Sequence, residues 1–339
     1  MKCVSISGVK KFVLKEKNKP ISRDGSVIID VKSCGICGSD IHYWLSGQPV
    51  GLIMGHEFAG VVVDPGSRSD LKKGDRVTGL PISPCMKCDA CHSGNYQYCS
   101  ETWTDAVGLS LDNSGAYAEY TSCRPDMIRK IPNGVSYDAA CMVEPSAVSL
   151  HAVNLSSIKI GDTVLIIGGG IIGLMAAEFA KMNGASYVVL LETNKKRGKK
   201  AVNYGKIDEY YDALNPNSVS QLITKTNGGF DKVIDCCGNA AAVSEALSCV
   251  KAGGKVIMVG VSMDSIPVAT ILGVMREVTM QGSIAYTPIE FDKCIDLISG
   301  KKINVTKYID DFIKLDEAQE AFERLTSGKD AAVKIIFKP

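Results

Sequence analysis

The 339-residue sequence lacks a strong charge of either sign. Its 38 lysine and arginine residues are balanced by 37 aspartate and glutamate residues, which leaves a formal net charge of +1. A dedicated nucleic-acid binder normally carries a marked basic excess, so this composition argues against nucleic acid as a partner. The same balance argues against electrostatic attachment to a membrane surface.

Long apolar runs are missing as well. The first twenty residues contain no stretch apolar enough for an export signal. The most apolar segment, residues 164–180, is interrupted by glycines and carries Glu178, so we interpret it as a buried strand and helix instead of a membrane span. Thirteen cysteines without an export signal indicate a reducing compartment, where thiolates bind metals or perform chemistry. We therefore expect a cytoplasmic protein.

The pattern of short elements changes along the chain, and the length alone favours two domains. Residues 1–145 contain short strand-like runs separated by glycine, proline, aspartate and serine. Between residues 163 and 261, strand-like and helix-like segments alternate, which is typical of parallel βαβ units. The tail from residue 286 contains an amphipathic helical pattern that Asp316 would cap, and it ends in a strand-like run at 332–337.

Four cysteines lie close together in the first part of the chain: Cys85, Cys88, Cys91 and Cys99. Four thiolates at this spacing can hold one tetrahedral Zn²⁺, which would stabilise a short lobe, about residues 84–100, that has almost no apolar core. A thioredoxin-like redox pair is a weaker interpretation because no strand precedes the cysteines. A nucleic-acid zinc finger is also disfavoured, because Lys87 is the one cation between Pro84 and Cys99.

A second set of metal-binding residue types lies outside this lobe. A catalytic zinc takes three protein ligands and keeps one open position. Here the ligands would be a cysteine thiolate, the His56 imidazole and a carboxylate from Glu57 or Glu144. A lone histidine is a weak signal, but a Gly-His-Glu triplet in a chain with a separate four-cysteine lobe is a stronger one. Spacing does not choose between Cys34 and Cys37 as the thiolate.

A glycine-rich turn marks a nucleotide site. Residues 163–167 are strand-like, and a helical pattern follows the turn formed by Gly168, Gly170, Ile172 and Gly173. In this context G-x-G-x-x-G is a dinucleotide fingerprint, in which the glycines allow a tight turn, close approach of the pyrophosphate and close packing of the helix. The helix N-terminus would supply amide donors to the anion.

An acidic residue follows at the distance expected for a ribose anchor. Glu192 ends the next apolar run, about 24 residues after Gly168. A carboxylate there accepts hydrogen bonds from the ribose hydroxyls and repels a 2′-phosphate, which favours NAD over NADP. The basic residues that follow, among them Arg197 at the same site, would soften this preference.

These motifs together resemble the zinc-dependent medium-chain dehydrogenases, and the segment from Glu144 to Val153 is similar to their polyol branch, the sorbitol and 2,3-butanediol dehydrogenases. The resemblance covers residues 34–333. It implies an α/β fold: a GroES-like, β-rich catalytic domain at 1–145, an NAD-binding Rossmann domain with a doubly wound parallel sheet at 146–285, and a return to the catalytic domain at 286–339.

The resemblance also assigns roles in the metal site. It places the thiolate ligand at Cys37. Simple alcohol dehydrogenases have a second cysteine where this chain has Glu144, whereas the polyol branch has a glutamate there, which leaves the metal harder and more electrophilic. In that branch both Glu57 and Glu144 can approach the zinc, and which one binds directly stays open. Two zinc ions per chain are expected, one catalytic and one structural.

The expected activity is hydride transfer between a secondary alcohol and NAD, giving a ketone. Zinc lowers the pKa of the alcohol hydroxyl, and Ser39 accepts the proton. By family analogy the proton then passes through the cofactor ribose to His42, which hands it to solvent. A polyol or vicinal diol is the expected small-molecule substrate; amino alcohols, cyclitols and hydroxysteroids are the alternatives.

A non-catalytic zinc scaffold is the competing class, but a scaffold has no need to keep the ligand set, Ser39 and the glycine turn together. Relatives of this type are commonly homodimers or homotetramers, and an apolar strand expected at residues 266–271 would support pairing between cofactor domains.

Overall fold

The computed structural model describes residues 1–268 and 270–339, so Ala269 lies outside the described residues. The strand expected at 266–271 was wrong for the described part of that segment: residues 266–268 form no strand, and helix α9 (Thr270–Val274) begins at residue 270. The chain divides into two compact units, one formed by Met1–Ala147 with Tyr286–Pro339 and the other by Val148–Ala285. The sequence predicts the first boundary slightly earlier, at residue 145. Among the described residues, no helix combines the length and apolarity that a membrane crossing requires.

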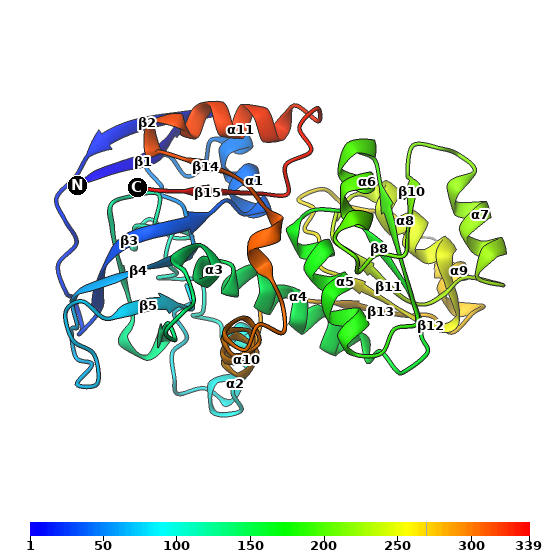
Figure 1. Ribbon diagram of the computed structural model, residues 1–339, viewed down its shortest axis with the longest axis horizontal. Coiled ribbons are helices and arrows are strands. Elements are labelled where there is room, and N and C mark those ends of the chain that lie inside the picture. Colours follow the sequence, from blue (N-terminus) through cyan, green and yellow to red (C-terminus); the bar gives the residue numbers. More distant parts are fainter. Residues whose placement is uncertain (269) are drawn as a thin grey trace. The chain divides into compact units, whose positions relative to one another are not determined.

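The first unit is built on a mostly antiparallel sheet in the order β14-β15-β3-β4-β5-β7, with β6 paired to β3; β1 and β2 form a separate hairpin. Its strands are β1 (Lys2–Gly8), β2 (Lys11–Glu16), β3 (Val27–Gly35), β4 (Glu57–Asp64), β5 (Arg76–Gly79), β6 (Tyr120–Cys123), β7 (Ile128–Lys130), β14 (Ile309–Ile313) and β15 (Lys334–Phe337). Figure 1 shows how the red C-terminal strand β15 returns to the blue strand β3, to which it is paired antiparallel. This return brings the end of the chain next to residues 34 and 35.

Short helices fill the connections of the first unit. They are α1 (Gly38–Ser46), α2 (Asp89–His92), α3 (Tyr137–Cys141), α10 (Pro288–Ser299) and α11 (Ala318–Thr326), with 3-10 turns η1 (Tyr96–Tyr98), η2 (Pro125–Met127), η3 (Val305–Tyr308) and η4 (Leu315–Glu317). Helix α4 (Val143–Ser156) begins in the first unit and continues into the second. The expectation that Asp316 caps α11 was wrong: Asp316 lies inside η4, and Glu317 holds the N-cap position.

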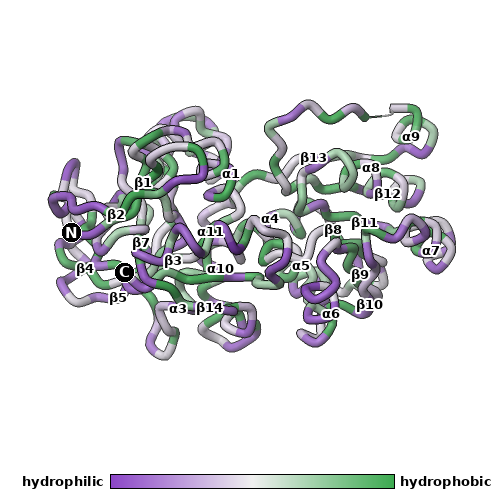
Figure 2. Tube along the Cα trace, turned by 90° about the horizontal axis from the view of Figure 1, so that it is seen from above, coloured by the Kyte–Doolittle hydropathy of each residue, from purple (hydrophilic) through white to green (hydrophobic). Residues whose placement is uncertain are grey.

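The second unit is a parallel sheet in the order β10-β9-β8-β11-β12-β13, which is the doubly wound order of a Rossmann domain. Its strands are β8 (Thr163–Ile167), β9 (Tyr187–Glu192), β10 (Glu209–Asp212), β11 (Phe230–Asp235), β12 (Val250–Met258) and β13 (Thr279–Gly282), and its helices are α5 (Ile171–Met182), α6 (Lys195–Asn203), α7 (Ser218–Lys225), α8 (Ala240–Cys249) and α9 (Thr270–Val274). Helix α6 is strongly hydrophilic and is drawn largely in purple in Figure 2.

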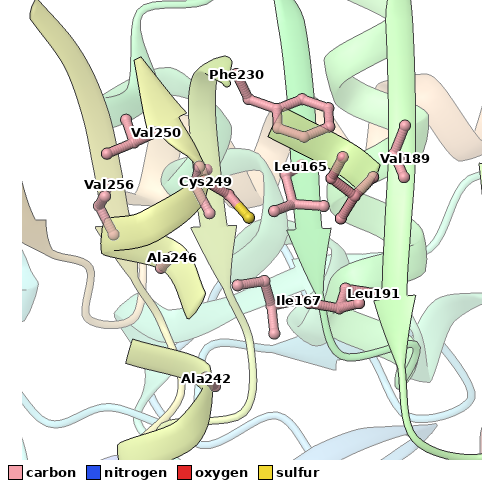
Figure 3. Packing of buried hydrophobic residues seen from close by; sticks show 12 residues of the cluster. Leu165, Ile167, Val189, Leu191, Phe230, Ala242, Ala246, Cys249, Val250 and Val256 are labelled. Atoms are coloured by element: carbon pink, nitrogen blue, oxygen red, sulfur yellow. The ribbon is translucent and has the colours of Figure 1, made fainter. Parts of the chain in front are cut away.

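The core of this sheet is apolar on every central strand. Leu165, Ile167, Val189 and Leu191 project from β8 and β9 and pack with Phe230 of β11, all of them at most 2% exposed (Figure 3). Full burial of each such side chain contributes about 1.5–3 kcal/mol. Because β8 is buried and is paired with β9 on one side and β11 on the other, its carboxyl end gives the following turn a well-supported starting point.

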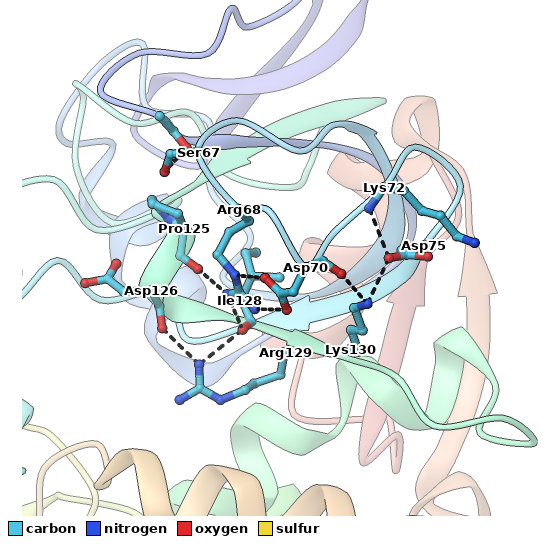
Figure 4. Close-up of polar contacts among 11 residues, drawn as sticks. Ser67, Arg68, Asp70, Lys72, Asp75, Pro125, Asp126, Ile128, Arg129 and Lys130 are labelled. Carbon is cyan, nitrogen blue, oxygen red and sulfur yellow. Dashed lines mark hydrogen bonds and ion pairs between the residues drawn. The ribbon is translucent and has the colours of Figure 1, made fainter.

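A polar network anchors the loop between β4 and β5 of the first unit (Figure 4). The Arg68 guanidinium donates to both carboxylate oxygens of Asp70, at 2.6 and 2.8 Å, and to the carbonyl of Pro125. Lys130 pairs with Asp75 at 3.2 Å. Exposed ion pairs of this kind contribute about 0–1 kcal/mol each, so the network fixes a loop and carries little of the stability.

Candidate active site

The first arm of the candidate site is the start of helix α1. Cys37 holds the N-cap position with extended backbone angles, and its amide donates to the Asp40 Oδ2 at 3.0 Å. This contact is one half of a capping box, which satisfies amide groups that a helix start would otherwise leave unpaired. The cap therefore fixes Cys37 and turns the Asp40 carboxylate, which is 0% exposed, into the interior.

The second arm is the turn that enters β4. Gly55 has φ +98°, a backbone conformation that favours glycine, and a Cβ there would lie 2.6 Å from the ring of Tyr117. His56 and Glu57 follow directly and are 5% and 0% exposed. The glycine is therefore required for both the turn and the close approach, and it places the imidazole and the carboxylate in the interior.

The two arms converge on one point. One ligand atom each from Cys37, His56 and Glu57 lies within 4.8 Å of the others. In the part of the chain that the structure describes, the buried His56 Nδ1 and Glu57 Oε1 have no hydrogen-bond partner. Sulfur, imidazole nitrogen and carboxylate oxygen are the donor types that zinc takes, so these residues fit a zinc ion.

The electrostatics of this point favour a cation. Burial opposes the charge of His56, but the neighbouring Asp40 carboxylate and Cys37 sulfur outweigh burial and raise the pKa of the imidazole well above its ordinary value. A raised pKa on a buried imidazole indicates strongly negative surroundings. The Asp40 Oδ1 lies 3.6 Å from His56 Nδ1, which leaves Nε2 as the nitrogen free to bind a metal.

Glu144 lies near the three converging groups without joining them. It stands in the first turn of α4 and is 8% exposed. Burial raises its pKa to about 7; the charge of His56 opposes this rise, and that of Glu57 adds to it. The Tyr286 hydroxyl faces the same carboxylate and acts to lower this pKa. Glu57, and not Glu144, is thus the carboxylate within 4.8 Å of Cys37 and His56.

Cys34, the other thiol that spacing allowed, lies outside this group. Its side chain is 0% exposed and its sulfur points to the Gly35 carbonyl at 3.7 Å. Burial raises the pKa of this thiol well above its ordinary value, which disfavours the thiolate form. The structure thus groups Cys37, and not Cys34, with His56 and Glu57.

Glu57 has a partner that no sequence motif indicates. The ammonium group of Lys334, from β15, forms an ion pair with Glu57 Oε2 and donates to the carbonyl of Ile36 at 2.7 Å. Lys334 is 1% exposed. A Cβ on Gly35 would lie 2.0 Å from Glu57 Oε2 and 2.7 Å from Lys334 Cε, so the absent side chain of Gly35 provides the space for this pair.

The predicted proton acceptors lie on α1. Ser39 is partly buried and His42 is exposed. They are three residues apart, so they share one side of the helix. The structure thus places Ser39 near the start of the helix, two residues after Cys37, and His42 one turn later at the surface.

The predicted structural lobe also converges. The sulfur atoms of Cys85, Cys88, Cys91 and Cys99 all lie within 4.8 Å of one another. The Cys85 amide donates to the Cys99 sulfur at 3.3 Å and lowers the pKa of this thiol to about 6. Four sulfurs at this separation fit one tetrahedral zinc ion.

The glycine turn of the second unit has the geometry of a dinucleotide turn. Gly168 has φ +98°, and Gly170 is the N-cap of α5. A Cβ on Gly173 would lie 2.0 Å from the Gly168 carbonyl oxygen. Ile172 is partly buried in the first turn of α5, and its carbonyl accepts from Ser149 Oγ at 3.0 Å. The amides at the start of α5 are thus available to an anion.

Glu192 is held firmly at the end of β9. Its carboxylate accepts from the amides of Gly169 and Asn194, both at 2.7 Å, and from Arg197 Nε at 3.0 Å. Burial acts to raise its pKa, but these donors outweigh burial and lower it. Glu192 therefore carries a fixed negative charge next to the glycine turn, and Arg197 is its ion-pair partner.

Two protein-family descriptions match the chain: the alcohol dehydrogenase GroES-like domain at residues 23–133 and the zinc-binding dehydrogenase at residues 172–300. With the fold and the converging ligands, they define the class as two-domain oxidoreductases with zinc and a Rossmann cofactor domain. The chain belongs to the zinc-binding dehydrogenase family. The expected fold class, family and enzymatic nature are thereby confirmed.

Named relatives span the whole chain. It is 31% identical to the sorbitol dehydrogenase of Halalkalibacterium halodurans, over 98% of this chain and 97% of that protein. The crystal structure of 2R,3R-butanediol dehydrogenase from Bacillus subtilis is 29% identical with a TM-score of 0.87, covering 100% of this chain and 99% of that one. A protein described as a zinc-binding dehydrogenase from Sinorhizobium meliloti 1021, bound to NADP, is 30% identical with a TM-score of 0.89 at the same coverage.

Proposed function

We propose that this enzyme transfers a hydride between a secondary alcohol and NAD, giving a ketone, with a polyol or vicinal diol as substrate. The observation that carries the proposal is the buried convergence of Cys37, His56 and Glu57 within 4.8 Å. The names of the sorbitol and butanediol dehydrogenases among its relatives support the substrate class.

The metal ligands in this proposal are Cys37, His56 and Glu57, with Glu144 as the nearby second carboxylate. A zinc ion held there supplies the Lewis acidity that lowers the pKa of an alcohol hydroxyl toward neutral pH. Asp40 faces His56 Nδ1 and so fixes the orientation of the imidazole. Cys85, Cys88, Cys91 and Cys99 hold a second, structural zinc.

The proton of the alcohol leaves through α1. Ser39, two residues after Cys37 and partly buried, accepts this proton and gives up its own hydroxyl proton, so it acts as a relay. His42 is exposed on the same side of the helix and releases it to solvent. The two roles follow from exposure. Ser39 is shielded near Cys37, whereas His42 lies at the surface, where it can exchange a proton with water.

The cofactor site is formed by Gly168, Gly170, Ile172 and Gly173, with Glu192 and Arg197 beside them. NAD supplies the hydride acceptor. The fixed charge of Glu192 supports NAD as the preferred cofactor, because a 2′-phosphate would meet a buried carboxylate whose pKa is lowered. The NADP-bound relative makes NADP the comparison to test.

The unit Met1–Ala147 with Tyr286–Pro339 would be the catalytic domain and Val148–Ala285 the cofactor domain. We expect a cytoplasmic homodimer or homotetramer that acts on a small molecule, with neither nucleic acid nor membrane as a partner. The exposed apolar residues Ile271, Val274 and Met275, next to the terminal strand β13, support pairing between cofactor domains.

Two measurements on the purified enzyme test the proposal. We expect two zinc ions per chain, and NADH absorbance that rises when polyols or vicinal diols are added with NAD. A panel that adds amino alcohols, cyclitols and hydroxysteroids separates the substrate classes. One zinc per chain, whose removal unfolds the lobe, together with no turnover on any alcohol, would favour the non-catalytic scaffold and refute the proposal.

A further inference from the structure

Tyr117 lies between the two arms of the metal site, in the loop that precedes β6. Its side chain is 0% exposed. The segment that carries it runs beside the turn before His56: the amides of Tyr117 and Ala116 donate to the carbonyls of Met54 at 2.9 Å and Gly55 at 2.8 Å. The position of the Tyr117 ring is thus tied to the turn that presents the imidazole.

The Tyr117 hydroxyl is committed to Asp40. It lies 2.6 Å from Asp40 Oδ2 and 3.5 Å from the Gly35 carbonyl. A phenol has one proton to donate, so the shorter distance assigns that proton to the carboxylate. A hydrogen bond from a hydroxyl to a buried carboxylate is of the strong, charge-assisted kind.

The two oxygens of Asp40 have different partners. Oδ2 accepts from both the Tyr117 hydroxyl and the Cys37 amide. Oδ1 faces His56 Nδ1 at 3.6 Å, and in the described residues 1–268 and 270–339 neither of these two buried atoms has a hydrogen-bond partner. With Oδ2 held twice, the carboxylate cannot rotate away, and Oδ1 stays directed at the imidazole.

Aromatic packing also restrains the Tyr117 ring. The ring of Phe337, from β15, lies 4.4 Å from it centre to centre, and that of Phe322, from α11, lies at 6.3 Å. Gly55 leaves room for the ring edge, because a Cβ there would approach it to 2.6 Å. The hydroxyl is therefore presented by a ring with little freedom to tilt.

We propose that Tyr117 is a positioning residue of the metal centre, which holds Asp40 so that Asp40 can orient His56 toward the metal. The inference rests on the proposed function, because it requires that His56 binds zinc. The Tyr117 hydroxyl acts on His56 indirectly, through its hydrogen bond to Asp40. Loss of such an outer partner typically weakens metal binding by about 10- to 100-fold.

The test is Tyr117→Phe, which keeps the ring and its packing and removes one oxygen. The matched control is Tyr308→Phe, which removes a hydroxyl from another ring of the same unit that is 1% exposed. Zinc release to a chelator is followed for both variants and for the unchanged enzyme. The four-cysteine lobe serves as an internal reference in every sample, and cobalt substitution reports the ligand geometry by absorbance.

We expect Tyr117→Phe to bind the catalytic zinc at least about tenfold more weakly, with a shifted cobalt spectrum, while the lobe zinc and the Tyr308→Phe variant behave as in the unchanged enzyme. Equal release of the catalytic zinc from all three proteins would overturn the inference. Loss of both zincs together with a lower melting temperature would show a structural role and would overturn it too. If the unchanged enzyme holds zinc in the lobe alone, the proposed function itself fails.

Discussion

Replacing Lys334 by methionine should show how the charge of the metal site is balanced. Lys334 and Glu57 form an ion pair in which both side chains are 0% exposed. Methionine has a similar length but no charge, so the substitution leaves the Glu57 carboxylate as a buried, uncompensated anion. It also removes the donor to the Ile36 carbonyl. Breaking a buried pair by removing one partner costs about 3–5 kcal/mol.

The cost should depend on zinc. In the metal-free protein nothing replaces the ammonium group, so we expect the full loss of about 3–5 kcal/mol in the free energy of unfolding. Zinc at the site would compensate the Glu57 charge, so the loss should be smaller in the loaded enzyme. By linkage, the variant should then bind the catalytic zinc more tightly.

Urea unfolding of the variant and of the unchanged enzyme, each with and without zinc, measures both quantities. The control is Lys338→Met, which removes a cation paired with Asp138 and 39% exposed, and which should cost about 0–1 kcal/mol with or without zinc. An equal loss for Lys334→Met in the two metal states, or a loss no larger than that of the control, would refute the reasoning about the buried charge.

Three further substitutions test the proposed roles. Cys37→Ala should abolish turnover while NAD still binds, and full activity measured by NADH absorbance would reject the ligand assignment. Glu192→Ala should raise the KM for NAD more than that for the alcohol, and an unchanged ratio of NAD to NADP use would argue against its ribose role. Glu144 has its pKa raised from 4.5 to about 7 in the folded state, so it holds a proton that the unfolded chain releases. The metal-free enzyme should therefore lose stability as the pH rises from 4.5 to about 7. In Glu144→Gln, the urea midpoint of unfolding should change less with pH over this range. An unchanged pH dependence in the variant would contradict the raised pKa of Glu144.

Much of the second unit could be predicted from the sequence, but strands β10 and β13 and helices α7 and α9 could not. The strand expected at 163–167 is β8 with the same bounds, and the helical pattern expected after the glycine turn is α5. Here an apolar run, a glycine turn and a helical periodicity follow one another, and together they indicate a strand, a turn and a helix. Strand β10 (Glu209–Asp212) was not predicted, because its residues are partly buried throughout and show no apolar alternation. The hairpin β1–β2 was missed for a related reason: the burial of β2 shows no consistent alternation.

The residue types of the metal site could be predicted, but their supporting partners could not. The sequence indicates the metal ligands by their residue types and by the glycine before His56. These ligands are Cys37, His56 and Glu57. Tyr117 and Lys334 have no motif, because each acts through a contact with residues far away in the chain. The one available signal for Lys334 was its place as the only charge in the strand-like run 332–337, where a lysine is costly unless it has a buried partner.

That partner is set by strand register. Ile336 of β15 is paired with Gly35 of β3, and Gly35 in turn is paired with Glu57 of β4. Side chains of paired residues, and of residues two apart on one strand, share a face of the sheet. Lys334 and Glu57 therefore point to the same face and meet above Gly35, where no side chain intervenes. A shift of β15 by one residue would turn Lys334 to the opposite face and leave Glu57 without its counter-ion, so the charge balance of the metal site depends on the pairing of three strands.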